Sequence, residues 1–239
     1  MDAPALNQAL YWVADRRLET GFPPTSRALS DPPGLLAIGG DLHPARLIDA
    51  YTHGIFPWYS AGQPILWWSP EPRAVLTPSA VRISRSLAKR LRNGGFDVSF
   101  DRAFAAVIAA CSEPREDGAG TWITPDMQAA YVALHRAGHA HSLECWRDGT
   151  LVGGLYGVAI GCAFCGESMF SRERDASKVA FVSLCHLLES WAYSLIDCQL
   201  PTPHLATLGA TLMLRADFEA ALANAVATTP AREAWRQSA

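Results

Sequence analysis

Two polar side chains stand two positions apart in the apolar stretch 195–200. Asp197 and Gln199 fall on one face of the strand expected there, because side chains alternate along a strand. Two polar side chains on the same face of an otherwise apolar strand line a site or hold a turn. The simpler interpretation is a solvated face on an edge strand.

A second candidate is Glu167, near the end of a predicted strand at 162–170. Alternation places Glu167 and Met169 on one face. We also expect Phe164 and Phe170 to lie on opposite faces from each other. Burying a carboxylate among thioether and aromatic groups costs free energy unless a polar group compensates. The sequence therefore leaves two interpretations: a functional carboxylate, or a strand-end glutamate that faces water.

Two further features suit contact with a nucleic acid. A row of cations is spaced at steps of three, four and three on one face of a predicted helix, and no acidic residue interrupts the stretch 81–92. These cations are Arg82, Arg85, Lys89 and Arg92. Several tryptophans stand beside Pro, Ser, Thr or Gly, where they can stack on a nucleobase; they are Trp58, Trp67, Trp68 and Trp122. The alternatives are a solvated helix face and tryptophans that seal a join between domains.

The composition excludes several classes of protein. The 239 residues are 49% hydrophobic and carry a formal net charge of −3, so any contact with nucleic acid must come from a local patch. No apolar run is long enough for a membrane helix, and residues 1–15 lack the basic start of a secretory signal. The six cysteines are expected to be reduced, buried thiols in a cytoplasmic protein. Cys162 and Cys165 have a CxxC spacing without a second pair, so no metal site is expected.

Turn signals divide the chain into two predicted domains. Residues 1–72 are rich in Pro, Gly and Trp and leave room for one short helix at 44–53, so a small, loop-rich domain is expected. Residues 73–239 contain predicted helices at 84–91, 103–111, 125–137 and 178–193 and predicted strands at 74–76, 96–100, 141–147, 150–158, 162–170 and 194–200.

This order indicates an α+β fold: a mixed sheet with helices on both faces, similar to the GNAT acyltransferases. In such a sheet a pocket opens where neighbouring central strands splay apart. The sequence lacks the Gly-rich loop, Arg/Gln-x-x-Gly-x-Gly, that would hold the pyrophosphate of coenzyme A.

An ordered series of motifs resembles the leucyl/phenylalanyl-tRNA–protein transferase family. The series runs from Gly34 to Ala210, and its order is more specific than any one motif. It comprises GLLAIGGDL at 34–42, GIFPW at 54–58, WWSP at 67–70 followed by PR at 72–73, TWI at 121–123, GHAHS at 138–142, LVGG at 151–154, GESMFS at 166–171, IDCQ at 196–199 and LGA at 208–210.

The resemblance implies a small amino-terminal domain and a GNAT-like catalytic domain. It also implies transfer of Leu, Phe and, less well, Met from aminoacyl-tRNA to proteins that begin with Arg or Lys, which marks those proteins for bacterial degradation. No metal or coenzyme is implied. We expect a cytoplasmic monomer that binds aminoacyl-tRNA and acceptor proteins but no membrane.

The resemblance assigns roles to residues. Asp197 and Gln199 match the pair proposed to act in catalysis: Asp197 would polarise Gln199, whose carbonyl would accept a hydrogen bond from the attacking amine. A ribose hydroxyl of the tRNA is an alternative proton acceptor. Glu167 would lie at the rim of an apolar pocket for the amino-acid side chain, built from Leu155, Phe164, Met169, Leu184 and Ile196.

Other matched positions would bind the tRNA. Trp58 and Trp122 match the residues that hold its terminal adenosine. Part of the basic tRNA-binding patch is matched by Arg85, Lys89 and Arg92. This sequence departs from the family at Ala88 and Asn93, where basic residues are common, and at Leu155, where Met is common.

Two other functions fit parts of the sequence. A coenzyme A-dependent acetyltransferase would share the fold but needs the missing pyrophosphate loop. A non-catalytic RNA-binding module would use the basic helix and the tryptophans, and would bind without turnover. A cysteine hydrolase is disfavoured because no cysteine is paired with a histidine in a recognisable motif.

Overall fold

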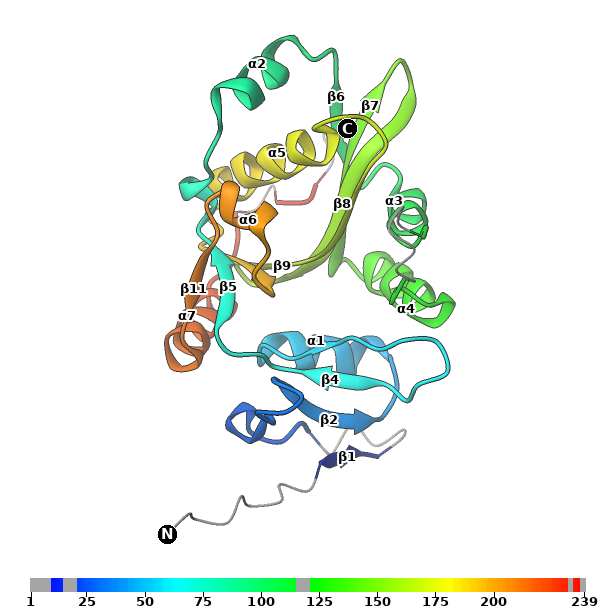
Figure 1. The fold of residues 1–239 in the computed structure, drawn as a ribbon, viewed down its shortest axis with the longest axis vertical. Coiled ribbons are helices and arrows are strands. Elements are labelled where there is room, and N and C mark those ends of the chain that lie inside the picture. Colours follow the sequence, from blue (N-terminus) through cyan, green and yellow to red (C-terminus); the bar gives the residue numbers. More distant parts are fainter. Residues whose placement is uncertain (1–9, 15–20, 115–120, 232–233, 237–239) are drawn as a thin grey trace.

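Two β-sheets organise the chain (Figure 1). The computed structural model describes residues 10–14, 21–114, 121–231 and 234–236. A four-stranded sheet in the order β1-β2-β4-β3 belongs to the first part of the chain, and a seven-stranded sheet in the order β11-β5-β10-β9-β8-β7-β6 belongs to the rest.

The amino-terminal sheet consists of short strands around one helix. Its elements are β1 (Tyr11–Val13), β2 (Leu35–Gly39), α1 (Pro44–Thr52), β3 (Phe56–Pro57) and β4 (Leu66–Trp68). The predicted helix is confirmed: Pro44 stands in its first turn, and Gly54 follows its end with a φ of 72°. The four strands were not predicted, because two to five residues are too few to show alternation.

The large sheet holds the remaining strands, with helices on both faces. Its elements are β5 (Arg73–Leu76), α2 (Arg85–Asn93), β6 (Asp97–Phe100), α3 (Phe104–Cys111), α4 (Pro125–Arg136), β7 (Ala140–Arg147), β8 (Thr150–Ile160), β9 (Ala163–Ser171), α5 (Ala176–Ser190), β10 (Leu195–Gln199), α6 (Pro203–Thr207), β11 (Thr211–Met213) and α7 (Arg215–Ala227). One face is covered by α5, against which α2 packs, and the other by α3, α4 and α7. The predicted mixed α+β architecture is confirmed.

Local signals explain where several of these elements begin. The Ser84 hydroxyl accepts a hydrogen bond from the Leu87 amide at the start of α2, and Thr124 caps α4 in the same way. Asp148 and Gly149 both have positive φ in the β7–β8 turn, as expected for a two-residue hairpin loop. The sequence did not predict α6, β11 or α7.

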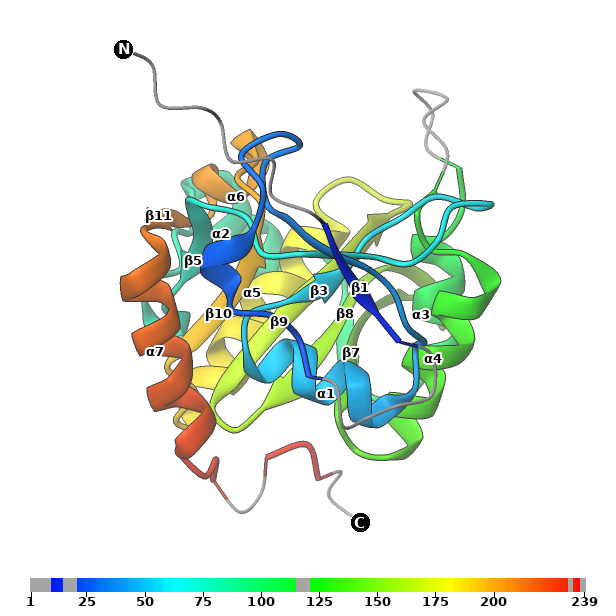
Figure 2. The same ribbon diagram turned by 90° about the horizontal axis from the view of Figure 1, so that it is seen from below.

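The two parts of the chain share a hydrophobic core. One cluster of buried residues contains Leu36, Tyr51 and Trp67 from the amino-terminal part together with Tyr131 and Tyr156 from the large sheet and its helices. Figure 2 shows α1 lying over one face of the large sheet, with α7 on one side and α3 and α4 on the other. The division between residues 72 and 73 stays a prediction.

Strands β9 and β10 are parallel neighbours that pair over a short length. Leu195 pairs with Ala163 and Asp197 with Cys165, and the pairing ends there. Beyond this point β9 continues to Ser171 along β8 while β10 turns away. A cavity opens where the two strands separate, as the sequence predicted.

Within the described ranges, each helix is too short or too polar to cross a bilayer.

Candidate active site

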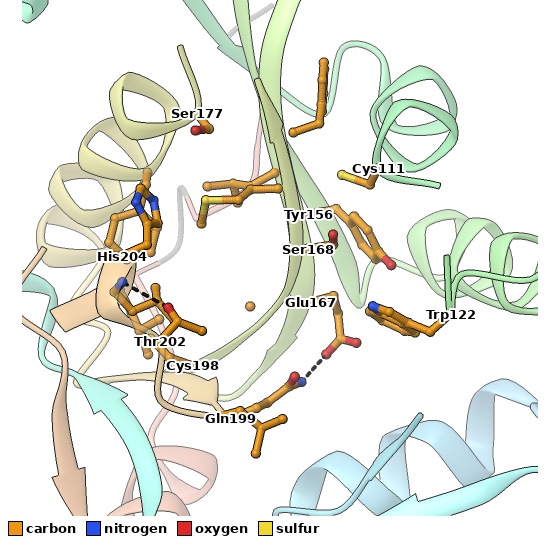
Figure 3. A pocket seen from close by; sticks show the side chains of 18 of the residues that line it. Cys111, Trp122, Tyr156, Glu167, Ser168, Ser177, Cys198, Gln199, Thr202 and His204 are labelled. Atoms are coloured by element: carbon orange, nitrogen blue, oxygen red, sulfur yellow. Dashed lines mark hydrogen bonds between the residues drawn. The ribbon is translucent and has the colours of Figure 1, made fainter. Parts of the chain in front are cut away.

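The cavity between β9 and β10 has a volume of about 720 Å³ (Figure 3). Its walls come from β8, β9, α5, β10 and α6, and also from β3 of the amino-terminal part and from the segment before α4. It brings together most of the predicted site residues: Trp58, Trp122, Leu155, Phe164, Glu167, Met169, Leu184, Ile196 and Gln199. Asp197 lies behind this wall, outside the lining.

One part of the cavity is apolar. Leu155, Phe164, Leu184 and Ile196 are each at most 3% exposed and belong to one hydrophobic cluster, against which Met169 packs. Phe181 of α5 also lines this part, although the sequence gave no reason to single it out among the apolar residues of that helix. The predicted apolar residues therefore do surround a single space.

Glu167 lies on a different face from Met169, so the predicted sharing of one face is wrong. On β9, Ser168 pairs with Tyr156 and Gly166 with Gly157, which leaves Glu167 as the extra residue of a bulge. The bulge shifts the alternation, and the Glu167 carboxylate points to the side of α4. Phe164 and Phe170 do lie on opposite faces, in different hydrophobic clusters.

Glu167 is buried and fully engaged, so the interpretation as a glutamate facing water is wrong. It is 9% exposed, and the Tyr131 hydroxyl donates to Oε2 over 2.8 Å. The Gln199 amide donates to Oε1 over 2.8 Å (Figure 3). Burial raises the pKa of Glu167 to about 7, against the lowering effect of the hydrogen bonds from Tyr51, Tyr131 and Gln199. The carboxylate is therefore poised to change protonation near neutral pH.

Two tyrosines extend this network. The Tyr51 hydroxyl of α1 and the Tyr131 hydroxyl of α4 are hydrogen-bonded to each other, and both side chains are buried. Burial first, and then the charge of Glu167, raise the pKa of both phenols, so they remain neutral donors. Sequence reasoning missed both residues, because a tyrosine on a helix face carries no local sign of a polar partner.

Asp197 and Gln199 are arranged differently from the prediction. Strand β10 lies between β5 and β9, so it is not an edge strand, and Asp197 is 1% exposed. Its carboxylate forms a two-pronged ion pair with Arg73 of β5, over 2.8 and 2.7 Å. It accepts the backbone N–H of Gln199 over 2.9 Å. The side-chain amide of Gln199 donates instead to Glu167. Asp197 therefore contacts the backbone of Gln199 and not its side chain, and the hypothesis that Asp197 polarises the side-chain amide is wrong.

The tryptophans divide into two groups. Trp58, 39% exposed, and Trp122 line the cavity, where their rings are open to a ligand. Trp67 is fully buried and donates its indole N–H to the Gly39 carbonyl, while Trp68 packs edge-on against Trp58. Trp67 is therefore part of the core and does not line the cavity, and the interpretation that the tryptophans seal a join between domains stays a prediction.

The basic stripe lies on and just before α2 (Figure 1), and none of its residues lines the cavity. All of its cations are exposed, and none of them is paired with a carboxylate in the described part of the chain; they are Arg82, Arg85, Lys89 and Arg92. A row of unpaired cations suits a polyanion better than an internal role.

The cysteines are unsuited to nucleophilic chemistry. All six are free, and burial raises the pKa of Cys165 and of Cys198, which lines the cavity. Thiols of raised pKa stay protonated and are poor nucleophiles. Among the described residues one group could offer ligands to a metal, namely Asp101, His135 and His141, but it lies outside the cavity and its atoms already bond to one another and to the Ala140 carbonyl.

Two sequence profiles of one family match the chain. Residues 75–223 match the sequence profile described as leucyl/phenylalanyl-tRNA protein transferase, and residues 40–71 match the profile of the amino-terminal domain of the same family. A solved ribosomal-protein-alanine N-acetyltransferase from Brucella melitensis is similar with a TM-score of 0.34 at 20% identity, over 45% of this chain and 81% of that one.

Relatives of the chain carry a single name. It is 63% identical over 205 residues to the leucyl/phenylalanyl-tRNA–protein transferase of Thiobacillus denitrificans, covering 86% of this chain and 90% of that protein. It is 58% identical to the protein of the same name from Aromatoleum aromaticum, covering 94% and 93%. By its sequence profile and by these relatives, the chain belongs to the leucyl/phenylalanyl-tRNA–protein transferase family and is an aminoacyltransferase.

Proposed function

We propose that this transferase takes Leu, Phe and, less well, Met from aminoacyl-tRNA and adds them to proteins that begin with Arg or Lys. The product would carry an amino terminus that marks the acceptor for degradation in the cytoplasm. The proposal extends the family activity to particular donors, acceptors and consequences. We further propose that the enzyme acts as a monomer.

The observation that carries the proposal is the junction of three environments in one cavity. An apolar compartment, walled by residues such as Phe164 and Met169, would take the donor side chain. Trp58 and Trp122 line another part and would stack on the terminal adenosine of the tRNA. Glu167 and Gln199, hydrogen-bonded to each other, lie in the same wall and would meet the ester carbonyl and the attacking amine.

The reaction needs little activation, because an aminoacyl ester is already reactive. The acceptor nitrogen bonds to the ester carbonyl carbon, the bond from that carbon to the ribose oxygen breaks, and one proton passes from the amine to the ribose oxygen. Because Glu167 binds the NH₂ end of the Gln199 amide, the carbonyl end is left to accept a hydrogen bond from the amine. Glu167, whose pKa is about 7, would hold the proton in transit.

The coarse selectivity follows from the walls of the cavity. Apolar surroundings discriminate strongly against polar side chains but separate Leu, Phe and Met weakly, since one methylene is worth about 1–3 kcal/mol. Among the described residues two carboxylates line the cavity, Glu167 and Glu113, of which Glu113 is paired with Arg172. Their negative charge would favour a cationic acceptor residue. The exposed cations of α2 would bind the body of the tRNA.

A transfer assay tests the proposal. Purified protein is mixed with radiolabelled phenylalanyl-tRNA and a test protein that begins with Lys, and in parallel with the same protein after acetylation of its amino terminus. Label should enter the free-amine protein alone. Binding of tRNA without transfer would favour the RNA-binding module instead, and loss of both would direct attention to acetyl-coenzyme A binding.

A further inference from the structure

Arg73 is buried outside the cavity wall, at a meeting point of three elements. Its side chain is 1% exposed. The guanidinium lies between two aromatic rings, 4.9 Å from the centroid of Phe56 in β3 and 4.6 Å from that of Phe218 in α7. Two ring contacts of this kind hold a planar cation in one orientation. Its Nη1 atom has no hydrogen-bond partner among the described residues.

The oriented guanidinium fixes the carboxylate of Asp197. Arg73 Nε bonds to Oδ1 over 2.8 Å and Nη2 bonds to Oδ2 over 2.7 Å, so both carboxylate oxygens are held. Oδ1 also accepts the backbone N–H of Gln199 over 2.9 Å. The position of the Gln199 backbone is thereby tied to Arg73 through a single carboxylate.

The backbone of Gln199 needs such support. Its φ is 63°, a region that residues other than Gly seldom occupy. The register of β10 against β5 shifts between Asp197 and Gln199, which makes Cys198 the extra residue of a bulge and places Gln199 directly after it. An uncommon conformation persists only where surrounding groups enforce it. Here it directs the Gln199 side chain into the cavity wall, where the amide reaches Glu167.

Stability alone is a poor explanation for this ion pair. Removing two charges from water offsets much of their attraction, and apolar residues of similar volume often serve as well or better in a core. The pair also leaves Nη1 of the guanidinium without a hydrogen-bond partner in the described part of the chain, which costs further free energy. A geometric role accounts for the bidentate contact between Arg73 and Asp197 and for the two aromatic rings that flank the guanidinium.

We propose that Arg73 is a positioning residue for aminoacyl transfer: through Asp197 it fixes the backbone of Gln199 and so aims the amide that receives the attacking amine. The inference rests on the role proposed above for Gln199. On this account Asp197 is also a positioning residue, and it neither gives nor takes a proton during transfer.

A double-mutant cycle tests the inference. Arg73→Lys keeps the charge but cannot bind both carboxylate oxygens in the same plane. In the otherwise unchanged enzyme it should lower kcat by about tenfold or more and change KM for phenylalanyl-tRNA by less than about threefold. In a Gln199→Ala background, where there is no amide to aim, the same substitution should lower kcat by less than about twofold.

Controls separate positioning from folding. Arg215 of α7 also joins the amino-terminal part through bonds to Ser69 and an ion pair with Glu71, and Arg215→Lys should leave kcat unchanged in both backgrounds. Thermal unfolding and tRNA binding are measured for every variant. If Arg73→Lys does not fold, Phe218→Leu, which removes one flanking ring, replaces it in the cycle.

Two outcomes would overturn the inference. Equal losses from Arg73→Lys in both backgrounds would show that Arg73 acts independently of the Gln199 amide. Full activity of the Gln199→Ala variant would show that transfer does not need the Gln199 amide, and Arg73 would then have no group to position. Either result leaves intact the transfer activity of the unchanged enzyme, so failure of the inference is distinct from failure of the proposed function.

Discussion

Glu167 is the residue whose environment departs furthest from what its neighbours in the chain suggest. It is enclosed by side chains from α1, α4 and β10, and its pKa is about 7, against 4.5 for an ordinary glutamate. Between these values the folded protein holds the proton and the unfolded chain releases it. Ionisation therefore opposes folding as the pH rises from about 4.5 to 7.

The Glu167→Gln variant tests this linkage. The amide stays neutral at every pH, so the free energy of unfolding of the unchanged protein, minus that of the variant, should fall by roughly 3 kcal/mol between pH 4.5 and pH 7. Urea unfolding at a series of pH values measures the difference. A difference that stays constant across this range would mean that the carboxylate titrates near its ordinary pKa.

Met169 belongs to the apolar compartment and should tune the choice of donor. Met169→Ala enlarges that compartment, and the ratio of kcat/KM for Phe-tRNA to that for Leu-tRNA should change by several-fold, in line with about 1–3 kcal/mol for each methylene. Val152→Ala is the matched control, because Val152 is buried on neighbouring β8 but does not line the cavity. An unchanged ratio would mean that Met169 does not contact the donor side chain.

At the scale of elements, the two bulges show where strand alternation stops being a guide. One on β9 sends Glu167 to the side opposite Met169, and one on β10 lies directly before Gln199, whose φ is positive. Both occur where the two strands separate, at the edge of the cavity. Helix α2 is the opposite case, because its cap and the exposure of its cations follow directly from local sequence.

The cations of α2 should govern the salt dependence of tRNA binding. Replacing Arg85, Lys89 and Arg92 together by Ala should weaken binding and lower the slope of log K against log salt by about two to three, slightly less than one for each lost phosphate contact. Filter binding at several salt concentrations measures this slope. Arg136→Ala, an exposed cation on α4, is the control and should leave it unchanged. Equal slopes for the triple variant and the unchanged protein would contradict a role of α2 in tRNA binding.

At the scale of the whole molecule, the amino-terminal part is packed into the same core as the large sheet. Tyr51 supplies a hydroxyl to the Glu167 network, Phe56 supplies a ring beside Arg73, and Trp58 lines the cavity. The site is therefore completed by residues that come before the sheet in the chain. We expect substitutions at this junction to affect the stability of the entire molecule.

Gly54 provides a test of that junction. A Cβ added there would lie 2.6 Å from Cε1 of Phe218, whereas Gly62 has a similar positive φ and no neighbour within 4 Å. Gly62→Ala should lower the free energy of unfolding by about 1 kcal/mol through backbone strain alone. Gly54→Ala should lower the free energy of unfolding by roughly a further 1–3 kcal/mol through overpacking against α7. Urea unfolding compares the two variants, and equal losses would mean that α7 yields freely at this contact.

The sequence alone determined the features that depend on neighbours a few positions away. It predicted α1 to α5 and β5 to β10, the Ser84 cap, the Asp148-Gly149 turn and the free cysteines. It also placed the apolar lining and the tryptophans of the cavity, through an ordered series of family motifs. The helices, the strands, the cap and the turn are local features, because hydrogen bonds within a turn and the periodicity of side chains are set by adjacent residues. The cavity residues were placed by the resemblance and not by local signals.

The tertiary structure alone decided which polar groups meet. Arg73 and Asp197 are 124 positions apart, Tyr51 and Tyr131 are 80 apart, and Tyr131 and Glu167 are 36 apart. The short amino-terminal strands and the two bulges likewise depend on partners from distant segments. Such pairings follow from the order of strands in the sheet and from the packing of helices on its faces. A buried ion pair or hydroxyl chain therefore leaves no mark on the residues beside it in the sequence.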